Sequence, residues 1–123
     1  MNPKEDNPLF TQECFACVCA EVAIDAESPE DFLNKATDFA NERLWGTLAA
    51  SITVPSAFRK SHGNVLDECT RRMRYGAVGI NQWSAIVFSL MSPPWGGHPS
   101  TTLAEPEGGI GWVHNSLMLS GIE

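Results

Sequence analysis

The sequence predicts a small α/β domain in which parallel strands alternate with helices. Short apolar runs rich in β-branched residues recur three times, and segments with helical periodicity separate them. The connections between these segments are short. A β-α-β-α-β order predicts parallel strands joined by right-handed crossovers. We therefore expect a small, three-layer-like β-α-β-α-β sheet, followed by a long loop rich in aromatic, glycine and proline residues and by a C-terminal edge strand.

The first expected strand covers residues 18–24 (VCAEVAI), and a helix follows it. The helix has a clear start, because Ser28 can accept hydrogen bonds from the early amides and Pro29 suits the first helical position. Its apolar side chains fall on one stripe: Phe32, Leu33, Ala36, Phe39 and Ala40. We expect this helix to end before Gly46.

The second strand is expected over residues 47–54, closed by Pro55, which cannot donate to a ladder. Residues 56–75 predict a second helix, in which Gly63 lowers stability by about 1 kcal/mol relative to Ala and so favours a break. The third strand is expected over residues 77–81. Three arginines gather before it: Arg71, Arg72 and Arg74. They suit the negative end of the helix, and anion binding is the alternative.

Regular patterning is lost from residue 82 to residue 111, a stretch that holds four prolines and five glycines. A nonregular segment of about thirty residues in so small a domain is normally functional or disordered. Large apolar side chains lie in or near it: Trp83, Phe88, Met91 and Trp95. We expect these side chains to pack against other protein groups, because if exposed they would form a hydrophobic patch prone to association. Residues 116–119 are expected to form the terminal edge strand.

Length and charge set broad limits. We interpret residues 1–123 as one domain with a flexible lead-in over residues 1–8. The formal net charge of -7 disfavours nucleic acid as a partner. The apolar runs fall short of the roughly 20 residues that span a bilayer, so we expect no membrane association. The N-terminus lacks the pattern of a signal peptide, and we expect a cytoplasmic protein.

The four cysteines predict no metal site. Cys14, Cys17 and Cys19 lie close together, but no second ligand pair exists at zinc-knuckle spacing. We interpret all four, Cys69 included, as free and buried small hydrophobes in a reducing compartment, with metal binding as the alternative. The three histidines are too scattered to suggest a site.

Four motifs, in order, resemble the C-terminal part of the catalytic domain of the aldehyde dehydrogenase family. Residues 13–18 (ECFACV) are similar to a Glu-x-Phe-Gly-Pro-Val stretch, and residues 39–48 (FANERLWGTL) to a helix of the Ala-Asn type with a glycine and a strand. Residues 76–81 (GAVGIN) are similar to a Gly-x-Val-x-Val-Asn strand, and residues 94–97 (PWGG) to a Pro-Phe-Gly-Gly loop. The resemblance covers nearly all of residues 9–119.

The resemblance implies roles for four residues. Glu13 corresponds to the carboxylate that holds the hydroxyls of the nicotinamide ribose, and Phe15 to the aromatic residue beside the nicotinamide. Asn81 and Trp83 correspond to positions near the aldehyde pocket, and residues 95–97 to a tight structural loop. NAD(P) is therefore the cofactor that the resemblance implies, although we expect none to bind to this chain alone.

The chain also departs from the family. Ala16 and Cys17 replace the usual Gly-Pro, His98 replaces the usual Lys, and an insertion precedes residues 109–111. The family's nucleophilic cysteine, its general-base glutamate and its Rossmann domain have no counterpart here. We therefore expect a truncated, aldehyde dehydrogenase-like protein that is not catalytically competent alone, with no catalytic residue assigned.

Two alternatives remain open. The chain could be a binding or interaction module for a small ligand or a partner chain. It could also complement a separate N-terminal portion of a split NAD(P)-dependent aldehyde dehydrogenase. A piece of a larger fold exposes surfaces that were interior, so we predict a homodimer or a higher homo-oligomer.

Overall fold

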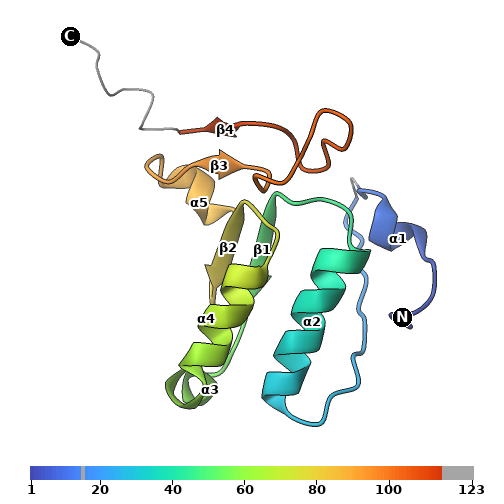
Figure 1. The fold of residues 1–123 in the computed structure, drawn as a ribbon, viewed down its shortest axis with the longest axis vertical. Helices are drawn as coiled ribbons and strands as arrows, with labels where there is room; N and C mark the ends of the chain where they lie inside the picture. Colours follow the sequence, from blue (N-terminus) through green and yellow to red (C-terminus); the bar gives the residue numbers. More distant parts are fainter. Residues whose placement is uncertain (15, 115–123) are drawn as a thin grey trace. The chain divides into compact units, whose positions relative to one another are not determined.

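The computed structural model describes residues 1–14 and 16–114 as a small mixture of helices and strands (Figure 1). The chain divides into two compact units, which we describe separately. The helical unit contains residues 1–45 and 59–73, and the strand unit contains residues 46–58 and 74–123.

The helical unit is built on two helices, α2 (Pro29–Arg43) and α4 (Gly63–Arg72), which lie side by side in Figure 1. Ser28 begins α2 as predicted, because its Oγ accepts from the backbone N–H of Asp31 at 3.2 Å. Leu33 of α2 and Leu66 of α4 are buried in the core of this unit. The first predicted helix is therefore confirmed.

The second predicted helix is interrupted near the expected position. It forms α3 (Ser56–Ser61) and α4, with His62 between them at φ -131° and ψ 34°. The short helix α1 (Pro8–Thr11) precedes both of them in the chain and buries Phe10, whose ring lies edge-on to Phe39 with centroids 5.4 Å apart.

Residues 1–8 make several contacts in the helical unit. The amino group of Met1 donates to the carbonyl of Glu21 at 2.8 Å, and Arg43 forms an ion pair with Asp6 at 3.2 Å. Both contacts are exposed to solvent.

The strand unit contains a two-stranded parallel sheet formed by β1 (Ala49–Ile52) and β2 (Ala77–Ile80). Ala49 pairs with Ala77 and Ile52 pairs with Ile80. Ile52 and Ala77 are buried, and the carbonyl of Thr47 accepts from Gly76 at 2.8 Å just before the ladder begins. The second and third predicted strands are thus confirmed in shortened form, in a small fold of mixed helix and strand.

Residues 18–24 do not form the strand that their pattern predicts. They carry no ladder pairing in the structure, and Val18 is 56% exposed. A strand needs a neighbour to satisfy its backbone groups, and no strand of the described residues pairs with this run. The three-stranded sheet is therefore not confirmed. The predicted strand over residues 116–119 lies outside the described residues.

The long loop of the strand unit packs its backbone closely against the backbone just before β2. It contains α5 (Ile86–Ser89) and β3 (Trp95–Gly96), and β3 pairs antiparallel with β4 (Trp112–Val113). A Cβ at Gly76 would lie 1.7 Å from the carbonyl oxygen of Gly96, so only glycine fits there. The indole N–H of Trp112 donates to the carbonyl of Gly97 at 3.0 Å.

Candidate functional site

The structure brings Asn81 and Trp83 to one open hollow of ≈610 Å³ in the strand unit. Because β1 and β2 run parallel, both strands deliver their carboxyl ends to this hollow, which is where ligands bind in open α/β sheets. The lining comes from the two segments that leave these strands: Ser51, Thr53, Val54, Pro55, Ser56, Asn81, Gln82 and Trp83. Two residues that the sequence singled out therefore share one site.

Asn81 fixes the geometry where the two strands end. Its backbone N–H donates to the carbonyl of Ile52 at 2.8 Å, and its side-chain Oδ1 accepts from the backbone N–H of Val54 at 2.8 Å. Its φ of 55° is left-handed, a conformation that asparagine tolerates better than most residues. The Nδ2 group has no partner among the described residues and is available to donate to a ligand.

Trp83 projects from the turn that follows Asn81 and is 76% exposed. The next residue, Ser84, is buried, and its backbone N–H donates to the Oγ of Ser51 at 3.1 Å. Ser51 therefore ties the turn to β1 on one side of the exposed indole.

The hollow is electrically neutral. None of the eight side chains that line it carries a charge or titrates near neutral pH. It offers hydroxyl and amide groups together with one large aromatic ring. This set can recognise a ligand, but it supplies no thiolate, general base or cation.

The other half of the predicted site belongs to the helical unit. Glu13 lies there with an exposed side chain, whereas Asn81 and Trp83 belong to the strand unit. Phe15 lies outside the described residues.

The prediction of buried cysteines is wrong for three of the four. Cys14, Cys17 and Cys19 are exposed, and only Cys69 is buried. The three lie in the stretch that forms no strand, so no core is built around them. All four are free, and no three His, Cys, Asp or Glu side chains of the described ranges could together hold a metal ion.

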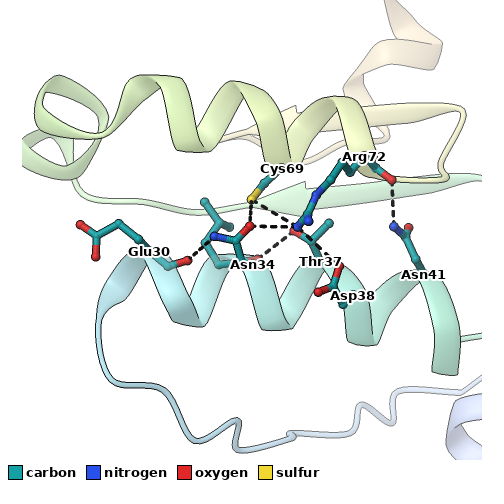
Figure 2. Close-up of polar contacts among 8 residues, drawn as sticks. Glu30, Asn34, Thr37, Asp38, Asn41, Cys69 and Arg72 are labelled. Atoms are coloured by element: carbon teal, nitrogen blue, oxygen red, sulfur yellow. Dashed lines mark hydrogen bonds and ion pairs between the residues drawn. The ribbon is translucent and has the colours of Figure 1, made fainter.

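A polar cluster between α2 and α4, which the sequence analysis did not identify, lies in the helical unit (Figure 2). Arg72 donates to the Oδ1 of Asn34 at 3.0 Å and pairs with Asp38 at 3.5 Å. Asn41 donates to the carbonyl of Arg72 at 2.8 Å, and the Cys69 thiol lies 3.5 Å from the Oδ1 of Asn34.

This cluster is structural. Asn41 satisfies a backbone carbonyl at the end of α4 that has no helical partner. The spacing of Asn34, Asp38 and Asn41 puts them on one face of α2. This spacing is the feature of the sequence from which the cluster could have been predicted. Arg72 is thus committed to α2, which disfavours the anion-binding interpretation at this position.

No protein-family model, curated protein or solved structure matches this chain. Within the described residues, no helix has the length and apolar character needed to cross a bilayer.

Proposed function

We propose that this chain is an aldehyde dehydrogenase-like module that binds a small uncharged ligand and does not catalyse aldehyde oxidation by itself. One observation carries the proposal: Asn81 and Trp83 share a hollow at the carboxyl ends of two parallel strands, and every residue that lines the hollow is uncharged.

Two features support binding without catalysis. Aldehyde oxidation by this family requires a thiolate and a general base beside the substrate, and neither lines the hollow. Cys69 is fully buried and contacts Asn34, so its thiol serves packing. For NAD(P), the described residues offer Glu13 as a ribose acceptor, while the neutral hollow offers no cation for a pyrophosphate.

The proposal is tested by incubating the purified chain with aldehydes and nicotinamide nucleotides. We expect no reduced nucleotide, and we expect at least one uncharged compound of a small-molecule panel to raise the melting temperature. That rise should be lost in Trp83→Ala and kept in Trp45→Ala, because Trp45 is a half-exposed tryptophan of the other unit. Reduced nucleotide that accumulates in proportion to the protein would overturn the proposal.

We propose a second copy of the chain as the protein partner. The residues of the strand unit up to position 104 hold a single formal charge, at Arg74, although the whole chain carries -7. The apolar patch on and beside α5 is exposed: Ile86, Phe88, Leu90 and Met91. Interface cores are depleted of charge and enriched in aromatic residues and Met, and an uncharged patch can meet its own copy without repulsion.

The same association would complete the predicted sheet. Among the described residues, β1 and β2 pair only with each other, so each keeps one open edge. We propose that a second copy supplies the further strand, which gives a sheet of three strands as expected from the sequence. A complex with a separately expressed N-terminal portion, formed by a chain that is monomeric alone, would instead favour the split enzyme.

The exposed thiols favour a reducing compartment such as the cytoplasm. Cys14, Cys17 and Cys19 are all accessible, and in an oxidising environment neighbouring accessible thiols form disulfides. Titration of the purified chain with a thiol reagent should modify three cysteines quickly and Cys69 only after unfolding.

A further inference from the structure

Most polar side chains that line the hollow have no hydrogen-bond partner among the described residues. The side chains of Thr53, Ser56 and Gln82 have no hydrogen-bond partner in the part of the chain that the structure describes, and the Nδ2 of Asn81 is also available. Ser51 accepts from Ser84, which leaves its hydroxyl hydrogen free to donate. Hydroxyl and amide groups both donate and accept, so they match a ligand that does the same at several neighbouring atoms.

The indole of Trp83 gives the same hollow a broad apolar surface. At 76% exposure the ring has most of its area open to solvent, although tryptophan usually gains by covering such area. A ligand that stacks on this ring needs one flat apolar face. A ligand that satisfies the surrounding groups needs a polar rim. The site therefore suits a molecule with an apolar face and a rim of groups that both donate and accept hydrogen bonds.

Charge restricts the ligand further. With no arginine, lysine or histidine in the lining, the hollow lacks the groups that bind phosphate or carboxylate. With no aspartate or glutamate, it offers no carboxylate counter-ion for an ammonium group, and cation–π attraction to Trp83 would act alone. Its volume of ≈610 Å³ lies within the range of small-molecule sites.

We infer that this hollow binds a neutral pyranose sugar, stacked on Trp83 and held at its hydroxyl groups by Asn81, Gln82 and the serine and threonine hydroxyls. A pyranose presents a C–H face for the indole and a rim of hydroxyl groups that donate and accept. This inference rests on the proposed function, because it names the ligand class of that same site.

Saturation-transfer NMR on the full chain tests the inference. The probes are the neutral methyl pyranosides of glucose, galactose, mannose and N-acetylglucosamine, with uncharged nucleosides as a second set. We expect saturation transfer to the ring protons of at least one glycoside. Trp83→Ala should weaken that binding about tenfold or more, because the stacking surface is lost. Trp83→Phe should restore part of it, and Trp45→Ala should leave it unchanged.

The variants keep the result interpretable. Trp83 is largely exposed, so its replacement should leave the fold intact, which a circular dichroism spectrum would verify. Glycoside transfer that is equal in Trp83→Ala and in the unmodified chain would overturn the inference. Transfer to nucleosides alone would also overturn it and leave the proposed binding function standing. The failure of that function has its own readout in the dehydrogenase assay and the melting-temperature panel.

Discussion

At the scale of single residues, Asn81 does the most to shape the site. It adopts a left-handed φ of 55°, and its backbone and side chain bond to the end of β1 and to the segment that leaves it. The resemblance gave this residue a place near a substrate pocket. In the structure, the side-chain Oδ1 of Asn81 accepts a hydrogen bond from Val54. The side-chain amide hydrogens therefore remain available to a ligand.

Asn81→Ala should lower the free energy of unfolding by about 1–3 kcal/mol, because it removes one hydrogen bond and puts at positive φ an alanine, which tolerates this conformation less well than asparagine. Asn81→Gly loses the same hydrogen bond but adopts the backbone conformation freely. Urea denaturation of both variants should therefore find the glycine variant to be the more stable of the two. Equal stabilities would show that the left-handed backbone conformation carries no strain.

The ion pair between Asp31 and Lys35 on α2 should make stability depend on pH at both extremes. Its hydrogen bond, 2.7 Å long, lowers the pKa of Asp31 and raises the pKa of Lys35. The Asp31 contribution is present above about pH 4 and is lost as the pH falls through the depressed folded value. The Lys35 contribution is present below about pH 10 and is lost as the pH rises through the raised folded value.

Asp31→Asn should flatten both limbs of the curve of unfolding free energy against pH. Asp67→Asn is a matched control, because Asp67 is exposed on α4 and forms no ion pair among the described residues. Thermal melts across the pH range measure both variants. A control that flattened the curve equally would assign the effect to net charge and not to the pair.

At the scale of elements, local signals were sufficient for the helices. Ser28 and Pro29 begin α2, and the break before Gly63 divides the second helix, as their types predict. The strands were harder to predict. Residues 18–24 have the composition of a strand, but a strand exists only with a partner, and pairing is not encoded in the run itself.

Substitution by alanine should have opposite effects on folding stability at two glycines. Gly63 opens α4, and a Cβ added there would meet no atom within 4 Å, so Gly63→Ala should stabilise by about 0.5–1 kcal/mol. At Gly76 the same carbon would collide with the backbone of Gly96, so Gly76→Ala should destabilise strongly, by about 3 kcal/mol or more.

Chemical denaturation compares the two glycine variants directly. If Gly76→Ala had the same free energy of unfolding as the unmodified chain, the close backbone contact between Gly76 and Gly96 would be contradicted. Gly63→Ala controls for the general effect of replacing glycine, since it changes the chain by the same methyl group.

Over the whole molecule, the roles that the resemblance gives to Glu13, Phe15, Asn81 and Trp83 remain predictions. The resemblance implied that Asn81 and Trp83 lie near a substrate pocket, and both line one hollow of the structure. The sequence could not show that the hollow is neutral, because its lining combines residues 51–56 and 81–83 from two separate segments. The exposure of three cysteines was also missed, since it followed from the strand that did not form.

The proposed homodimer should be sensitive to charge on the apolar patch. Leu90→Glu places a carboxylate where the side chain is 57% exposed, so the monomer should fold while association weakens at least about tenfold. Leu103→Glu adds the same charge to a side chain that is 92% exposed and lies outside the patch, and it should leave association unchanged.

Light scattering at micromolar concentration measures both leucine variants against the unmodified chain. We expect twice the chain mass of 13.4 kDa for the unmodified protein and for Leu103→Glu, and the single mass for Leu90→Glu. A monomeric unmodified chain would contradict the homodimer.

We propose that the neutral hollow at the ends of β1 and β2 binds a ligand without performing chemistry on it. An NMR titration of the isotope-labelled chain with aldehydes, nicotinamide nucleotides and neutral glycosides tests it most directly. We predict that the neutral glycosides cause chemical-shift changes confined to residues 51–56 and 81–84, with every ligand recovered unaltered. Shifts that gather around Glu13 and leave the hollow unchanged, or aldehyde consumed during the titration, would contradict it.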